Sequence, residues 1–214
     1  MKKRTKLPYY LTGGAAVAAV LLATAARASA RKQNAQLQLL SVEQLRQVMP
    51  KLSEDKARAL LPFLNWAMVE AEVTTPLRMA AFLAQVAEES AELRYMEEIE
   101  SGSEYEGRKD LGNTEPGDGI RYKGRGPIQL TGRYNYRAAG LALGLKLEEN
   151  PALAAEPAVG FRVAAWYWTS HDLNTLADNR NFSGITLRIN GGLLGEDLRE
   201  KYYQRALRVL GGAA

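Results

Sequence analysis

Two glutamates, nine residues apart in an acidic stretch, have the spacing and surroundings for acid–base chemistry. Glu89 ends a run rich in alanine, valine and leucine, where burial would raise the pKa of its carboxyl group and keep it protonated. Glu98 would then be the ionised partner. Hydrolysis of a glycosidic bond needs such a pair. The alternative interpretation is a solvated acidic helix face, made of Glu88, Glu89, Glu92, Glu97, Glu98 and Glu100.

The spacing of the two glutamates sets a condition on the backbone. In a continuous helix, nine residues add about 13.5 Å of rise and half a turn, so the two carboxyl groups would point apart. A working pair therefore predicts that the helix breaks within residues 90–94. An inverting reaction would also need roughly 6.5–9.5 Å between the carboxyl groups, to leave room for water.

Residues 122–131 predict the floor of a groove beside these acids. Gly124 and Gly126 bracket an arginine, so the backbone can turn tightly and approach a ligand closely. Residues 128–130 alternate apolar, polar and apolar, which predicts a short, half-buried strand that shows the Gln129 amide on one face. Amide, hydroxyl and backbone groups beside two carboxylates suit a carbohydrate site.

Helix signals predict the elements that come before the acids. Ser41 and Gln44 have the spacing of a capping box for a short helix. Ser53 is expected to cap a second helix with an apolar face. Thr75 and Pro76 begin a third helix, which carries apolar residues inward and ends at the acidic stretch.

The rest of the body is predicted to be loops followed by further helices. Residues 101–126 contain seven glycines and predict loops or a short β-hairpin. Later helices are expected over residues 134–143, 155–169 and 198–210. The fold class predicted is therefore mainly α, a helical domain with a small β/loop lobe that forms a substrate groove.

Composition excludes several classes of site. The chain has no cysteine and a single histidine, His171, which rules out disulfides, thiolate metal sites and multi-histidine metal centres. We expect no metal and no cofactor. The net charge of +4 includes five positive charges within residues 1–30, so the remainder carries −1. Without a basic face on the body, we expect no nucleic-acid partner.

The N-terminal segment has the layout of an export signal. A basic start precedes an uncharged, apolar run, and small residues follow at positions 28–30. We expect residues 1–30 to be a signal peptide or a signal-anchor, and residues 31–40 to be a linker. If it is retained, the segment 10–28 would hold the chain at the inner membrane. Either outcome exports the body, residues 41–214, to the periplasm, cell wall or medium.

Motifs spread over about 140 positions resemble those of glycoside hydrolase family 19, which contains chitinases and compact chitinase-like lysozymes of phage and bacterial origin. The matching segments are residues 82–90, 105–114, 117–119, 122–131, 134–136, 166–168 and 189–192. The resemblance implies a lysozyme-like α+β fold and an inverting hydrolase, expected to be a monomer. It covers nearly all of the body and none of the first thirty residues.

The resemblance assigns roles to individual residues. It makes Glu89 the general acid and Glu98 the general base, with the hydroxyl of Thr131 helping to hold the attacking water. Arg199 resembles the family arginine that orients the base. Residues expected to hydrogen-bond the N-acetylated sugars are Gln129, Tyr134, Asn135 and Asn190.

Three further side chains have two interpretations each. Glu106 is a second candidate for support of a catalytic carboxylate, and the alternative is an ion pair with Arg108 or Arg125. Trp166 and Trp168 lie in an apolar helical run, which favours a place in the core over a role as sugar platforms.

The chain departs from the family pattern beside the predicted acid. The family usually has histidine where this chain has Glu88, and it favours glycine at the position of Ala91. The first change adds a negative charge next to Glu89, and a like charge raises a carboxyl pKa. Three hypotheses follow. The first is a peptidoglycan-degrading lysozyme or endolysin; the second is a chitinase of the same fold; the third is a wall-binding protein that lost turnover through Glu88.

Overall fold

The computed structural model describes residues 39–212. The predicted signal or anchor segment and nearly all of the predicted linker lie outside this range. Over the described range, no helix has both the length and the apolar character needed to cross a membrane. Nor do those residues bring three or more acidic, histidine or cysteine side chains together in a way that would hold a metal ion.

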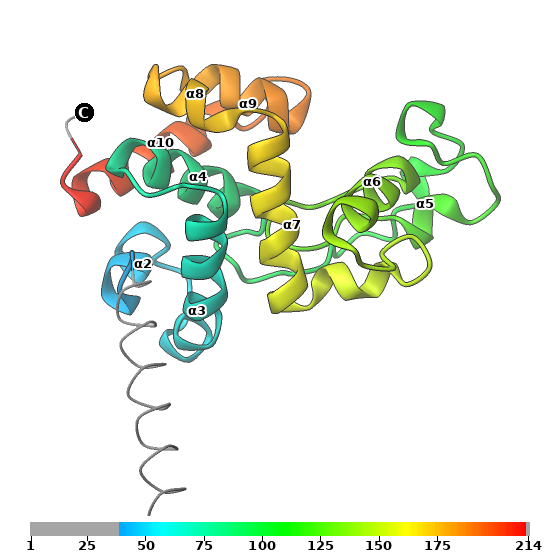
Figure 1. Ribbon diagram of the computed structural model, residues 1–214, viewed down its shortest axis with the longest axis horizontal. Helices are drawn as coiled ribbons and strands as arrows, with labels where there is room; N and C mark the ends of the chain where they lie inside the picture. The colour runs from blue at the N-terminus through cyan, green and yellow to red at the C-terminus, as the bar shows by residue number, and fades with distance from the viewer. Residues whose placement is uncertain (1–38, 213–214) are drawn as a thin grey trace, which may run out of the picture. The chain divides into compact units, whose positions relative to one another are not determined.

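The described residues are mainly helical, as the sequence predicts. The first three helices begin where their caps predict: Ser41 and Gln44 form the capping box of α2, Ser53 caps α3, and Thr75 caps α4. The α-helices are α2 (Val42–Val48), α3 (Glu54–Glu70), α4 (Pro76–Glu89), α5 (Asp118–Arg121), α6 (Arg133–Leu143), α7 (Pro157–Ser170), α8 (Leu173–Asp178), α9 (Phe182–Asn190) and α10 (Glu196–Leu210) (Figure 1). The short 3-10 helices are η1 (Ser103–Tyr105), η2 (Lys109–Leu111) and η3 (Pro151–Ala155).

Helix α4 lies at the centre of the hydrophobic core. Its nine residues from Met79 to Ala87 are all buried, because α10, α8 and α9 cover it. Phe82 packs edge-to-face against Trp168 of α7, with 5.1 Å between the ring centres. A helix buried this completely is held rigidly, and the predicted acid Glu89 is its last residue.

Helix α7 connects this core to a second, loop-rich lobe. It packs against α3 and α8, and it also packs against α6 and η3 (Figure 1). The second lobe contains η1, η2, α5 and α6. Within the described residues it has no continuous strand, only isolated antiparallel bridges that join Arg125 to Glu97 and to Leu130.

The predicted strand over residues 128–130 is wrong. These residues belong to a tight turn between Arg125 and Leu130, and Gln129 lies in the left-handed region with a φ of 52°. The backbone N–H of Gln129 donates to the carbonyl of Gly126, which closes the turn. Alternation of apolar and polar residues predicts which side chains are buried, and it does so equally well in a turn.

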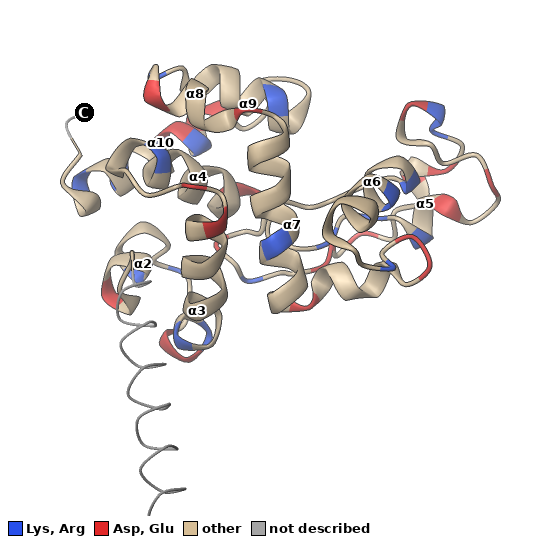
Figure 2. Cartoon of the chain, in the orientation of Figure 1, with Lys and Arg blue, Asp and Glu red and all other residues tan. Residues whose placement is uncertain are grey.

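Lysine and arginine residues are interspersed with aspartate and glutamate over the helices and loops (Figure 2). Many of them pair across the fold. The Arg78 guanidinium on α4 binds Asp178 of α8 with two hydrogen bonds, and that contact holds the pKa of Asp178 below its usual range. Such partly exposed pairs contribute modestly to stability, and they fix the register between helices.

Candidate active site

A groove with a cavity volume of about 510 Å³ runs between the two lobes of the described domain and contains both predicted catalytic carboxylates. Its lining residues come from the end of α4, the loops of the second lobe, α7 and the end of α9. They are Glu89, Glu98, Tyr105, Arg108, Leu111, Ile128, Gln129, Leu130, Thr131, Asn135, Tyr167, Ile189 and Asn190. Six of the predicted site residues therefore meet in one place.

Glu89 is held at the end of α4 by a buried polar chain. Its carboxylate accepts a hydrogen bond of 2.6 Å from Nη2 of Arg199 on α10. Nη1 of the same arginine donates to Gln85, whose amide donates in turn to Thr186 of α9. Burial raises the pKa of Glu89, Arg199 opposes this, and the charge of Glu88 adds to it. The net shift favours a protonated carboxyl group at this position.

The helix break that the spacing requires is present. Helix α4 ends at Glu89, and the backbone of Ala91, Glu92 and Leu93 lies in the left-handed region, with φ values between 50° and 65°. Ser90 stabilises the turn, because its hydroxyl donates to the carbonyl of Val86 and accepts from the N–H of Leu93. Residues without glycine thus turn the chain where the family favours glycine.

The break also removes the interpretation of a solvated acidic helix face. Glu92 is buried, and its carboxylate accepts hydrogen bonds from the Tyr202 hydroxyl and the backbone N–H of Lys51. Glu97 pairs with Lys123 and Arg125. These acids therefore anchor the turn and the adjacent loop, while Glu89 and Glu98 face the groove.

Glu98 has a polar environment of a different kind. One carboxylate oxygen accepts a 2.8 Å hydrogen bond from the Tyr105 hydroxyl, and the other accepts a 2.9 Å bond from the backbone N–H of Gly124. The N–H of Glu98 donates to the carbonyl of Gly124. These two donors fix the position of the carboxylate at the groove, which is what a general base requires.

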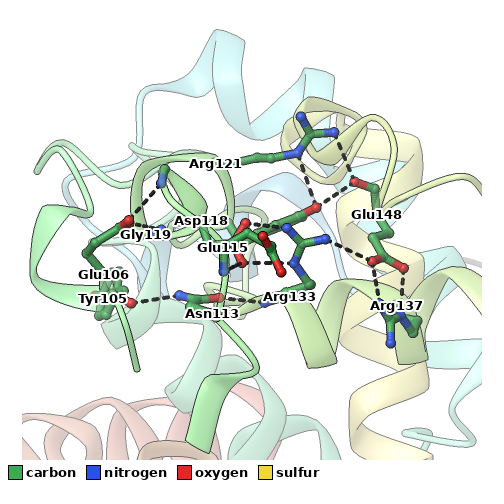
Figure 3. A network of polar contacts seen from close by, with 12 residues as sticks. Tyr105, Glu106, Asn113, Glu115, Asp118, Gly119, Arg121, Arg133, Arg137 and Glu148 are labelled. Atoms are coloured by element: carbon green, nitrogen blue, oxygen red, sulfur yellow. Dashed lines mark hydrogen bonds and ion pairs between the residues drawn. The ribbon is translucent and has the colours of Figure 1, made fainter. Parts of the chain in front are cut away.

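A network in the second lobe holds Tyr105 in place (Figure 3). The amide of the buried Asn113 donates to the Tyr105 carbonyl and accepts from the backbone N–H of Arg133. The Arg133 guanidinium forms two hydrogen bonds to the buried Asp118 and keeps the pKa of that carboxyl below its usual range. The side chain that binds Glu98 is thus supported from behind by a charged cluster.

The groove floor presents polar groups that have unused hydrogen-bonding capacity. The Thr131 hydroxyl donates to the carbonyl of Gln129, so its oxygen can still accept hydrogen bonds through its lone pairs. The Gln129 amide donates to Gly126, and the Asn135 amide donates to the carbonyl of Thr131, which leaves each side-chain oxygen able to accept. Asn190 lines the opposite side and is exposed.

The prediction that Arg199 orients the base is wrong. The arginine contacts Glu89, the predicted acid, and it does not contact Glu98. The reason is geometric: α10 packs along α4, so an inward-pointing residue on the first turns of α10 meets the end of α4. Arg199 therefore orients the acid and not the base.

Two other predicted residues lie outside the groove lining. Tyr134 is 57% exposed, and its ring packs over Gly112, where a Cβ would come within 2.6 Å of the ring. The Glu106 carboxylate accepts hydrogen bonds from the backbone N–H groups of Gly117 and Gly119. It therefore fixes a loop of the second lobe, and it forms neither of the ion pairs considered for it, since Arg108 binds Asp110 and Arg125 binds Glu97.

The two tryptophans of α7 pack in or against the core, as the sequence favours. Trp168 is fully buried, and its indole N–H donates to Asn174. Trp166 is partly buried against the core. Their neighbour Tyr167 instead lines the groove, and its hydroxyl donates to the carbonyl of Arg188.

Several lining residues were not assigned a role from the sequence. Tyr105 and Tyr167 stand within recognised motifs, and their place in those motifs was the available signal. Arg108, Leu111, Ile128, Leu130 and Ile189 also lie within these motifs, but their exposure to the groove depends on how the two lobes meet.

A mainly helical domain with two differently held carboxylates in one groove defines a glycoside hydrolase. The family profile described as class I chitinase, glycoside hydrolase family 19, matches residues 65–184. The chain belongs to this family, and the resemblance of its motifs is thereby confirmed.

Relatives and solved structures agree with this membership. The chain is 43% identical over 115 residues to an endochitinase of Arabidopsis thaliana, an alignment that covers 53% of this chain and 39% of the relative. It is 41% identical over 105 residues to a family 19 domain-containing protein of Haemophilus influenzae, covering 49% and 50%. The chain thus spans half or less of the length of these relatives. Chitinase C from Streptomyces griseus superposes with a TM-score of 0.66 at 28% identity, covering 82% of this chain and 78% of that structure.

Proposed function

We propose that the protein hydrolyses the glycosidic bonds of a polysaccharide of N-acetylated sugars by inverting acid–base catalysis. One observation carries the proposal: Glu89 and Glu98 line the same groove in opposite environments. Glu89 is partly buried at the end of α4 and has a raised pKa, whereas Glu98 accepts hydrogen bonds from the Tyr105 hydroxyl and the backbone N–H of Gly124. This pairing is the one that assigns an acid and a base.

In the proposed reaction, the Glu89 carboxyl group donates its proton to the oxygen of the departing sugar. The Glu98 carboxylate accepts a proton from a water molecule, whose oxygen forms a bond to the anomeric carbon from the opposite face. The Thr131 hydroxyl, which donates to Gln129, accepts a hydrogen bond from this water and fixes its position. One bond to the anomeric carbon forms as the other breaks, so the configuration inverts.

A chitin chain is the substrate that the relatives favour. The relatives of Arabidopsis thaliana are named endochitinases, and the superposed structure is a chitinase. Gln129, Asn135 and Asn190 would supply hydrogen bonds to the N-acetyl and hydroxyl groups of such a chain. The groove is lined by both polar and apolar side chains, which is typical of sites that bind sugars.

Peptidoglycan is the second candidate, because the first thirty residues have the layout of an export signal. We propose that export brings the domain to the cell wall, where the glycan strand of N-acetylated sugars is its substrate. This candidate includes the lysozyme or endolysin hypothesis, with the segment 10–28 either removed or retained at the inner membrane.

Product analysis distinguishes these candidates. Purified chitin oligomers and purified peptidoglycan would be incubated with the wild-type chain and with Glu89→Gln and Glu98→Gln, and the products identified by mass spectrometry. We expect new reducing ends from one polymer, and a loss of about 100-fold or more in each variant. Inversion would be read from the anomer first formed, by NMR. Binding of wall fragments without any new reducing ends would instead support a wall-binding protein that lost turnover through Glu88.

A further inference from the structure

Arg199 contains a buried donor that lacks an acceptor. Two of its guanidinium nitrogens bind Gln85 and Glu89, whereas Nε has no hydrogen-bond partner in the described part of the chain. The side chain is only 4% exposed. A buried, charged N–H group is rarely left unpaired, since its desolvation is costly. This donor therefore points to a partner on its free side.

Glu88 and Nε of Arg199 both lie next to Gly195. A Cβ placed on Gly195 would be 2.8 Å from Oε1 of Glu88 and 3.8 Å from Nε of Arg199. The carboxylate oxygen and the donor are therefore within about 6.6 Å of each other, the two distances taken end to end. A rotation of the flexible glutamate side chain would bring its oxygen within reach of Nε, either directly or through one bridging water.

We propose that Glu88 is a positioning residue, which accepts a hydrogen bond from Nε of Arg199 through the space left by Gly195 and so fixes the guanidinium against Glu89. The inference rests on the proposed function in one respect, the role of Glu89 as the proton donor. The proposal assigns a role to Glu88, the residue that stands where the family usually has histidine.

The charges of the cluster explain why such a residue is useful. Arg199 on its own favours the ionised form of Glu89, which is the wrong form for a proton donor. A second carboxylate on the same guanidinium offsets that positive charge. In agreement, Arg199 lowers the pKa of Glu89 and Glu88 raises it, while burial makes the largest contribution.

Neither of the two nearby tyrosine hydroxyls can offset the positive charge of Arg199 in place of Glu88. The Tyr167 hydroxyl donates to a backbone carbonyl, and the Tyr202 hydroxyl donates to the carboxylate of Glu92, so neither hydroxyl can neutralise the arginine. The charged or titratable groups around the cluster are Glu88 on α4, Glu92 in the turn that follows, Tyr167 on α7, Arg188 on α9, and Arg199, Tyr202 and Arg205 on α10.

The glycine at position 195 is part of the arrangement. Gly195 begins α10 with a φ of 73°, a conformation that suits glycine, and it supplies no side-chain cap. The Glu88 carboxylate is thereby close to the N-terminus of α10. A larger residue at position 195 would expel the carboxylate from the space next to Nε.

The decisive measurement is a titration of the Glu89 carboxyl group by ¹³C NMR in the full chain, with and without Glu88→Gln. We expect the pKa of Glu89 to fall by about one unit in the variant, which corresponds to a tenfold change in the proton-binding constant. Asp197→Asn is the matched control: it removes one exposed carboxylate from the first turn of α10, and it should leave the titration unchanged.

The pH profile of kcat/KM provides the second readout. Because the donor must be protonated, activity falls as pH rises through the pKa of Glu89, so this limb should move to lower pH in Glu88→Gln. Gly195→Ala should move it in the same direction. An unchanged titration of Glu89 in Glu88→Gln would overturn the inference, whatever the activity. A wild-type chain that releases no products while the titration shift is present would overturn the proposed function alone.

Discussion

The substitution Gly124→Ala tests whether the groove works as the geometry implies. Gly124 lies against the predicted base: its N–H donates to Glu98, and its carbonyl accepts from the backbone N–H of the same residue. A Cβ at this position would be 2.6 Å from Oε1 of Gln129 and 3.1 Å from Oε2 of Glu98. Both side chains must therefore move when the methyl group is added.

The size of the effect follows from these distances. Ordinary contact begins near 3.4 Å, so the Glu98 oxygen must retreat by about 0.3 Å and the Gln129 oxygen by about 0.8 Å. Since a misplacement of about 1 Å costs roughly 100-fold in rate, we expect kcat/KM to fall about 10- to 100-fold. The free energy of unfolding should fall by only about 1 kcal/mol, because the crowded atoms are the ends of flexible side chains.

The assay is release of reducing ends from the polymer that the wild-type chain cleaves, with thermal unfolding measured in parallel. Gly192→Ala is the control, since it adds the same methyl group where no atom lies within 4 Å. It should retain wild-type activity. If Gly124→Ala cleaves as fast as the wild-type chain, then the contact with Glu98 is irrelevant to turnover, and the role of Glu98 as the base is refuted.

Three further predictions concern the carboxylates and their support. Tyr105→Phe removes a hydrogen bond to Glu98 and should lower kcat/KM about tenfold with little change in melting temperature; an unchanged rate would contradict this. Burial raises the pKa of Glu89, so the stability contributed by this carboxyl group is present below its ordinary pKa of 4.5 and is lost as pH rises through its pKa in the folded protein. We therefore expect Glu89→Gln to have a higher melting temperature than the wild type at pH 7, and the difference should shrink towards pH 4. Asp118→Asn should cost about 2–3 kcal/mol in urea unfolding at pH 7. Because Arg133 lowers the pKa of Asp118, that stabilisation is present above pH 3.8 and should disappear as pH falls below it.

The helices could be predicted from the sequence because their signals are local. The caps at Ser41, Ser53 and Thr75 each satisfy backbone groups within three residues, so the pattern is sufficient to place the start of the helix. The break after Glu89 could also be predicted, from the requirement that two carboxylates nine residues apart share a groove. The backbone conformation of the break could not be predicted. Three consecutive left-handed residues without glycine depend on the buried Glu92 and on its partners far along the chain.

The features that sequence could not supply are long-range. The contact of Arg199 with Glu89 joins residues 110 positions apart and depends on how α10 lies along α4. The prediction of a strand over residues 128–130 is wrong, because alternation of apolar and polar residues indicates burial and not backbone conformation. Glu106 has the residue type of a catalytic acid, and only its distance to two backbone N–H groups shows that it holds a loop.

The end of α4 explains how one short segment gives two carboxylates opposite tasks. The helix that carries Glu89 is buried over most of its length, and burial raises the pKa of this carboxyl group. The turn that follows ends with the buried Leu93, the chain becomes exposed at Arg94, and Glu98 is then held by donors of the second lobe. In a continuous helix the two carboxyl groups would point apart and could not share one groove. The division into acid and base therefore depends on the break, and a substitution that extends the helix through Ala91 and Leu93 would abolish turnover while leaving both glutamates present.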